Sequence, residues 1–190
     1  MTEKYRNAGS KEYATGNDFC RVYLEQMNSL YLLSLLLTAD SQKAEQCFVS
    51  GFEDSVSNNS VFKEWAHCWT RRIIIIRAIE LLRPRPRSKN ELNDTRLSLL
   101  NGNMPTELRA YPNFTAIITL HAFERFTFVM SVLEKYSVHE CSLLLGCLRR
   151  DVIEARVAAI QHLATAEIAT ETHLVEKVSS AIAGMNYASR

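Results

Sequence analysis

Apolar residues in this chain recur at intervals of three and four, the spacing that places side chains on one face of an α-helix. Three such faces fill the first half. The first consists of Leu24, Met27, Tyr31 and Leu35, the second of Ala44, Cys47, Phe48, Phe52 and Val56, and the third of Phe62, Trp65, Trp69, Ile73 and Ile76. Asp40 or Ser41 can cap the second helix. The helical spacing continues on both sides of Ile73–Ile76, so we expect helix there rather than a short buried strand. The pattern predicts an all-α protein.

The clearest break in the pattern is the segment "RPRPRSKN", in which Pro84 and Pro86 cannot continue a helix. We therefore predict two small helical domains, 20–83 and 113–164, joined by a flexible linker over 84–112. A short helix near "DTRLSLL" is expected within the linker. The polar residues 1–19 predict a flexible arm rather than a signal peptide. The tail, 165–190, carries one narrow apolar stripe: Val175, Val178, Ile182 and Met185.

The second domain is expected to begin with a helical pair, Phe114–Leu120 and Phe123–Tyr136. Two apolar faces follow, one of Val138, Cys141, Leu144 and Leu145 and one of Val152, Ala155, Ala159 and Leu163. Gly146 lies between them, where a left-handed glycine can end a helix, and the short turn after it is typical of a helix-turn-helix. Arg149 and Arg150 then stand at the first turn of the second helix, the part that enters the major groove in such units. The spacing is equally compatible with a packed hairpin whose arginines face solvent.

Composition and residue spacing argue against several classes of function. The 190 residues carry a formal net charge of +1, so attraction to a polyanion has to come from local clusters. The five cysteines form no CxxC pair, which indicates reduced thiols, and His139, Cys141 and Cys147 lack the paired spacing of a zinc site. The apolar run Leu30–Leu37 is too short to span a bilayer. The histidines show no catalytic spacing, and there is no glycine-rich phosphate loop. We expect a cytoplasmic protein that is not an enzyme and uses no cofactor, metal, membrane or small-molecule substrate.

The segment "LHAFERFTFVMSVLEKYSVHECSLLLGCLRRDVIEARV" resembles the fourth region of bacterial RNA polymerase sigma factors of the extracytoplasmic-function type. Leu120 and Arg125 match the L-P-x-x-x-R start of that region. Its helix-turn-helix pattern is matched at Ser137, Glu140, Gly146 and Val152. His121 replaces the usual proline, and Ile153–Ala155 replace a stretch that is commonly basic.

The first half is similar to the second region of the same family, through "LYLLSLLLTADSQKAEQCFVSGFED" and "FKEWAHCWTRR". The matching residues are Ala44, Glu45, Phe52, Phe62, Trp65 and Arg71. Gln46, Val49 and Ser50 replace an Asp, a Gln and a Glu that grip the polymerase in the family, and Arg72 replaces an asparagine. The resemblance covers residues 20–83 and 114–164.

The resemblance implies a sigma factor that binds core RNA polymerase and promoter DNA to start transcription, with an anti-sigma factor as a conceivable further partner. The residues expected to bind DNA are Arg149, Arg150, Ile153, Glu154, Arg71, Arg72 and Arg77. Those expected to bind polymerase are Glu45, Gln46, Val49 and Phe52. Arg83, Arg85 and Arg87 extend the basic cluster, and Trp65 and Trp69 beside it suit stacking on a single strand unless both are core. The alternative is a sigma-derived regulator that binds DNA or protein but no longer core polymerase.

Overall fold

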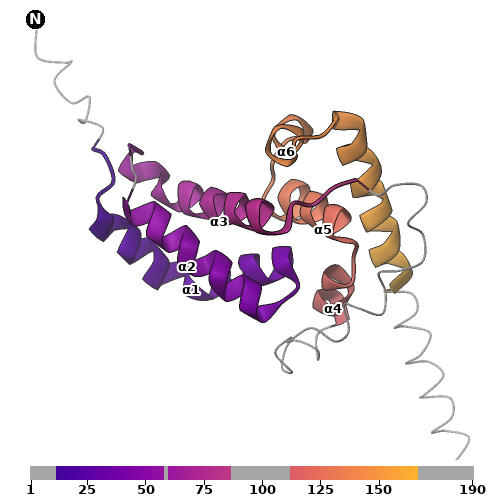
Figure 1. Cartoon of the computed structure of the whole chain (residues 1–190), viewed down its shortest axis with the longest axis horizontal. Helices are drawn as coiled ribbons and strands as arrows, with labels where there is room; N and C mark the ends of the chain where they lie inside the picture. Colours follow the sequence, from indigo (N-terminus) through magenta and orange to yellow (C-terminus); the bar gives the residue numbers. More distant parts are fainter. Residues whose placement is uncertain (1–11, 58–59, 87–111, 167–190) are drawn as a thin grey trace, which may run out of the picture. The chain divides into compact units, whose positions relative to one another are not determined.

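The computed structural model describes residues 12–57, 60–86 and 112–166, and every regular element in these ranges is helical (Figure 1). The all-α prediction is therefore confirmed for this part of the chain. Residues 1–11 of the predicted arm, most of the predicted linker with its short helix (87–111) and the tail from residue 167 lie outside the described residues. No described helix has the length and apolar content needed to cross a membrane.

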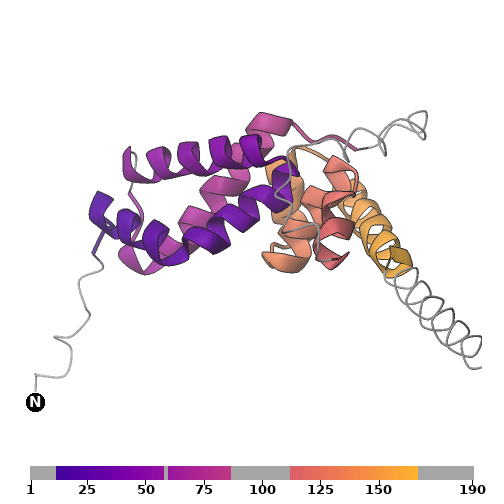
Figure 2. The ribbon, with the colours of Figure 1, turned by 90° about the horizontal axis from the view of Figure 1, so that it is seen from below.

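Apart from residues 39–41, which group with the second unit, the described residues form two compact units that divide between Arg83 and Pro84. The first unit contains α1 (Gly16–Thr38), α2 (Ser41–Ser57), the short 3₁₀ turn η1 (Lys63–Trp65) and α3 (Ala66–Leu82). The three α-helices lie side by side in both views (Figures 1 and 2). Their shared interior is built from small and branched apolar side chains. Buried residues there include Leu30, Leu33, Leu35, Leu37, Ala44, Cys47, Ile74, Ile75 and Ala78.

Two of the predicted helix faces match the core only in part: Leu35 is buried and Trp69 packs against the core as expected, but other members are exposed. Leu24 and Met27 were expected inside, yet they are 71% and 49% exposed, because α1 buries Phe19, Val22 and Tyr23 instead. Trp65 is 53% exposed, so the third face is also displaced. A 3₁₀ turn has three residues per turn rather than 3.6, so η1 shifts the helical phase before α3 begins.

The first unit starts earlier than residue 20. Ala14 and Phe19 are buried in one cluster with Val22 and Ala66, and α1 begins at Gly16. The arm that was expected to run to residue 19 therefore does not include residues 12–19.

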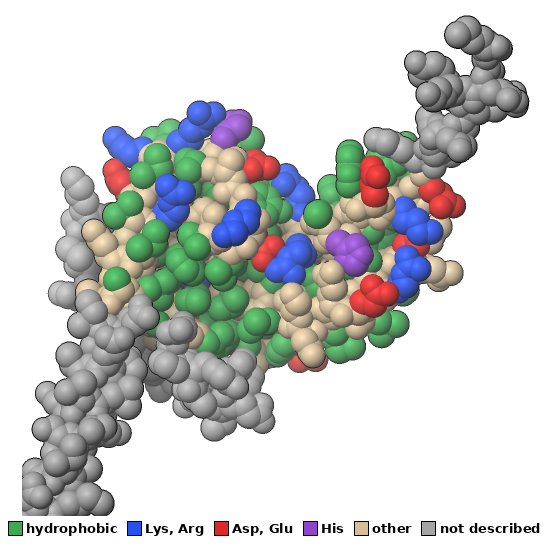
Figure 3. Space-filling view, turned by 180° about the vertical axis from the view of Figure 1, so that it is seen from behind, with side chains coloured by type: hydrophobic (Ala, Val, Ile, Leu, Met, Phe, Trp, Pro, Cys, Tyr) green, Lys and Arg blue, Asp and Glu red, His purple; other side chains and the backbone are tan. Residues whose placement is uncertain are grey.

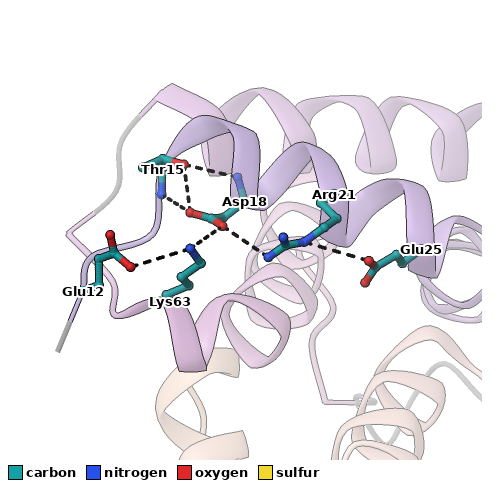
Figure 4. A network of polar contacts seen from close by, with 6 residues as sticks. All are labelled: Glu12, Thr15, Asp18, Arg21, Glu25 and Lys63. Atoms are coloured by element: carbon teal, nitrogen blue, oxygen red, sulfur yellow. Dashed lines mark hydrogen bonds and ion pairs between the residues drawn. The ribbon is translucent and has the colours of Figure 1, made fainter. Parts of the chain in front are cut away.

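A network of polar contacts holds the start of α1 (Figure 4). The Thr15 backbone N–H and hydroxyl donate to the Asp18 carboxylate at 3.0 and 2.8 Å. Lys63 Nζ lies 3.2 Å from Asp18 Oδ1 and 3.7 Å from Glu12 Oε2, and Arg21 also contacts Asp18 at 3.3 Å. The backbone hydrogen bond from Thr15 is the main cause that lowers the pKa of Asp18 from 3.8 to about 2. The network ties the first turn of α1 to η1.

The second unit contains α4 (Pro112–Ile118), α5 (Ala122–Phe128), the π-helical turn η4 (Val129–Leu133), α6 (Val138–Leu145) and a helix over residues 149–166. Val152, Ala155 and Ala159 of this last helix are buried, as their spacing predicts. The segment expected as one helix to Tyr136 instead ends in η4, and Lys135 takes a left-handed conformation with φ of 62°.

A buried arginine holds the turn between α4 and α5. Arg125 is 2% exposed, and its guanidinium donates to the backbone carbonyls of Ile118 at 3.2 Å and Leu120 at 2.9 Å. Burial lowers the pKa of Arg125 to about 10, so the group keeps its charge at neutral pH. The two carbonyls replace part of the hydration that the cation loses.

Candidate nucleic-acid interface

The turn that follows α6 is fixed by caps at both ends of that helix. The Ser137 hydroxyl accepts from the Glu140 backbone N–H at 3.2 Å, and the Ser137 N–H donates to the Glu140 carboxylate at 2.8 Å, which is a complete capping box. At the other end, Gly146 takes a left-handed conformation with φ of 63°, as predicted, and its N–H donates to the Ser142 carbonyl. The Cys147 N–H donates to the same carbonyl at 3.1 Å. The chain is therefore turned within two residues of the end of α6.

The last helix has its own cap at the start. The Leu148 N–H donates to the Asp151 carboxylate at 3.1 Å, and the Asp151 N–H donates to the Leu148 carbonyl at 3.0 Å. Asp151 thus uses its charge to stabilise the first turn, whose exposed N–H groups favour a carboxylate. This local role accounts for an acidic residue next to two arginines.

Four of the predicted DNA-binding residues lie together on the exposed side of the first two turns of this helix. Arg149 and Arg150 are both exposed, and Ile153 is 44% exposed. An Arg149 nitrogen lies 2.9 Å from His139 Nδ1 of α6. Arg150 forms an ion pair with Glu154 at 3.6 Å, with 74% and 69% of the two side chains exposed. Pairs this exposed contribute about 0–1 kcal/mol, so Arg150 can exchange Glu154 for another anion at small cost.

The predicted arginines of α3 do not form one surface. Successive residues of an α-helix are rotated by about 100°, so Arg71, Arg72 and Arg77 point in different directions around α3. Arg71 donates to the Ser29 hydroxyl at 2.9 Å. Arg77 forms an ion pair with Asp54 of α2 and another with Glu80 at 2.6 Å, and the hydrogen bond to Asp54 is the main cause that raises the pKa of Arg77. The charge of Arg77 is thus used to join α2 and α3.

The basic stretch after α3 is partly described. Arg83 ends α3 in a left-handed conformation with φ of 45°, and its N–H donates to the Ile79 carbonyl at 2.7 Å. Arg83 and Arg85 are exposed, whereas Arg87 lies outside the described residues. Trp69 packs against the cluster around Phe19, so it is a core residue, but the exposed Trp65 is not.

The predicted polymerase-binding residues are on α2. Glu45, Gln46 and Val49 are exposed, with Val49 at 45%. Phe52 is half-buried and packs edge-on against Tyr23, with ring centroids 5.0 Å apart. Three of the four side chains are therefore accessible to a partner, and Phe52 mainly joins α2 to α1.

The sequence did not predict the groove that lies between α1 and α3. It has a volume of about 500 Å³ and is lined by residues 24–29 of α1 and by His67, Cys68 and Arg71 of α3. Gln26 interrupts α1 there with non-helical angles (φ −113°, ψ 15°), and its side-chain nitrogen lies 2.7 Å from His67 Nδ1. The misassigned face of α1 hid this groove, because Leu24 and Met27 at its edge were expected in the core.

Charged side chains are dispersed on the face that Figure 3 shows, and potential metal ligands are dispersed through the described residues. On the face shown in Figure 3, basic and acidic side chains are interspersed rather than gathered by sign. Within residues 12–57, 60–86 and 112–166, no three His, Cys, Asp or Glu side chains are grouped so that they could hold a metal ion. All five cysteines are free, and burial raises the pKa of Cys47 and of Cys141 to about 11.

No protein-family model matches the chain, and no curated protein or solved structure matches it at a significant level.

Proposed function

We propose that this chain is a transcription initiation factor of the sigma type, which binds promoter DNA through the helix over 149–166 and core RNA polymerase through α2. The observation that supports this proposal most is the capped turn at Gly146. It presents Arg149 and Arg150 on the first exposed turn of the next helix. That is the position from which a recognition helix reaches base edges in the major groove.

The chemistry of that turn suits DNA. Arginine can donate two parallel hydrogen bonds to the acceptor edge of guanine or to phosphate oxygens. The N-terminus of the helix adds a partial positive charge. Ile153 is 44% exposed one turn further on and can contact a thymine methyl group, and Glu154 can accept from cytosine. The same side of the helix can therefore contact DNA phosphates, which position the protein, and base edges, which specify the sequence.

The proposed polymerase contact rests on the exposed side of α2. Glu45, Gln46 and Val49 give it one charged, one amide and one apolar side chain. A partner helix of basic and apolar character fits such a surface. For strand capture by the first unit, the exposed candidates are Trp65, Arg83 and Arg85, whereas Arg77 is paired with Asp54.

One observation favours the alternative, a regulator that binds DNA without core polymerase. Gln46 and Ser50 stand where the resemblance expects carboxylates, and Gln46 is exposed but uncharged. Run-off transcription and pull-down with purified core polymerase separate the two functions. A sigma factor yields transcripts from a genomic promoter library, whereas the alternative binds DNA but retains no polymerase.

The DNA contact is tested with duplexes selected from a random-sequence library by the parent protein. We expect Arg149→Ala to weaken binding to the selected duplex by about 5- to 150-fold, which corresponds to about 1–3 kcal/mol. Arg21→Ala removes the same charge from an exposed arginine of the first unit and serves as the matched control. Selection of no sequence by the parent, or equal losses for the two variants, would contradict the proposal.

A further inference from the structure

The helix over 149–166 carries a second apolar face that the second unit does not use. Its inner face consists of the buried Val152, Ala155 and Ala159. On the outer side, Ile153, Val157 and Ile160 are 44%, 46% and 49% exposed. Ala164 lies on the same outer side of the helix and is also exposed. We call the four residues 153, 157, 160 and 164 the outer seam.

The outer seam has the spacing of a helix-packing surface. Its intervals are four, three and four residues, which is the alternation of a coiled-coil seam. Branched apolar side chains in this pattern normally insert between the side chains of a facing helix. Scattered exposed apolar residues need no explanation, but three consecutive seam positions with branched side chains indicate a partner helix.

We propose that the outer seam pairs with the same seam of a second copy of this chain, with the two helices antiparallel. The order four, three, four reads the same in both directions, so a two-fold axis between residues 158 and 159 maps the seam onto itself. Ile153 then faces Ala164 of the second copy, and Val157 faces Ile160. Every apolar position finds an apolar partner, which is the condition for an isologous interface.

The positions of the arginines favour an antiparallel over a parallel pair of helices. In a parallel pair, Arg149 and Arg150 of both copies would meet at one end, together with the positive ends of both helix dipoles. The antiparallel pair separates the four arginines to opposite ends and opposes the dipoles. Beside the seam, Glu154 falls opposite the uncharged Gln161 of the second copy.

The strength of the pairing follows from its length. The seam spans 11 residue steps of about 1.5 Å, or about 17 Å, which is short for a helix pair. It covers less than the roughly 800 Å² per partner of a standard interface. The dimer is therefore weak and forms at high protein concentration.

Sedimentation velocity over about a hundredfold range of concentration tests the proposal, in reducing buffer because Cys68 is exposed. We expect a reversible monomer–dimer equilibrium for the parent chain. Val157→Lys and Ile160→Glu each place an unpaired charge in the seam and should weaken association at least about tenfold. Leu143→Glu changes a 67% exposed apolar residue of α6 outside the seam and should leave association unchanged.

The double variant Val157→Lys/Ile160→Glu determines the orientation. In the antiparallel pair each lysine faces a glutamate of the second copy, so the double variant should associate more strongly than either single variant. In a parallel pair like charges would meet, and association would be weakest. Circular dichroism melting verifies that the variants fold.

A parent chain that stays monomeric throughout, seam variants that associate like the parent, or a double variant no better than the single ones would each overturn the proposal. None of these measurements includes DNA or polymerase. The test of the pairing is therefore independent of the proposed function, but Ile153 belongs to both surfaces, so one helix cannot use it for pairing and for DNA at the same time.

Discussion

Gly51 of α2 faces Ile74 of α3 so closely that a Cβ atom added at Gly51 would lie 3.1 Å from Ile74 Cγ1. The same added atom would lie 3.2 Å from the Tyr23 hydroxyl oxygen of α1. Because Ile74 is fully buried and Tyr23 nearly so, neither side chain can move freely. At Gly51 all three helices of the first unit thus approach one another closely, and the absence of a side chain permits this.

Gly51→Ala is expected to destabilise the first unit by about 1 kcal/mol, the net of an overpacking cost of about 1–3 kcal/mol and a gain in helix propensity near 1 kcal/mol. Urea unfolding measures the change. Gly16→Ala is the matched control, because its Cβ would meet Val56 at 3.5 Å, an ordinary contact distance. Equal effects at the two glycines would contradict the close approach at Gly51.

Arg125→Met is expected to destabilise the second unit by about 3 kcal/mol, since hydrogen bonds from a charged group are worth about 1.5–3 kcal/mol each and two buried carbonyls lose their donor. Thermal unfolding followed by circular dichroism measures the loss. Arg150→Met, at a side chain 74% exposed, should change stability by less than about 0.5 kcal/mol. If the two variants melt alike, Arg125 does not hold the turn between α4 and α5.

Asp18 should give the first unit an acid-sensitive component of stability. Its pKa in the folded protein is about 2, below the ordinary value of 3.8, so the carboxylate stabilises the fold fully above pH 3.8. That contribution is lost as the pH falls from the ordinary value through the folded one. Asp18→Asn should therefore flatten the dependence of the unfolding free energy on pH between about 4 and about 2.

Urea unfolding at several pH values measures this slope. Glu25→Gln is the control, because the Glu25 side chain is 57% exposed and lies 3.9 Å from Arg21. An unchanged slope for Asp18→Asn would show that Thr15 and Lys63 do not stabilise the charged carboxylate.

The sequence predicted the helical class, the left-handed Gly146 and the inner face of the last helix, because these depend on local spacing. It could also have shown the capping box, since Ser137 and Glu140 are three residues apart. The exposure of Leu24 and Trp65 was not predictable in the same way. It depends on the kink at Gln26 and on the 3₁₀ turn η1, and the spacing of apolar residues reveals neither.

The surroundings of the expected DNA-binding residues also depend on packing that residue spacing does not reveal. Arg77 was expected to bind DNA from its place in a basic cluster, but Asp54 lies 23 residues away in the chain and becomes its partner only through the packing of α2 on α3. The outer seam was not predicted from the sequence, because one apolar face is enough to explain how this helix packs in a folded unit. Its spacing is visible in the sequence, but only the structure distinguishes the inner row from the outer one.

The residues before α1 have a practical consequence for dividing this protein. Tyr13 pairs with Phe62 in a β-bridge and stacks on its ring, with centroids 4.8 Å apart. The Ala14 N–H donates to the Val61 carbonyl at 2.7 Å, and the Lys63 N–H donates to the Glu12 carbonyl at 2.9 Å. A fragment cut at the helix boundary, Gly16, would leave those groups of Val61 and Lys63 without their backbone partners and open the cluster around Phe19. The smallest fragment that can fold as the first unit therefore begins no later than Glu12, four residues ahead of its first helix.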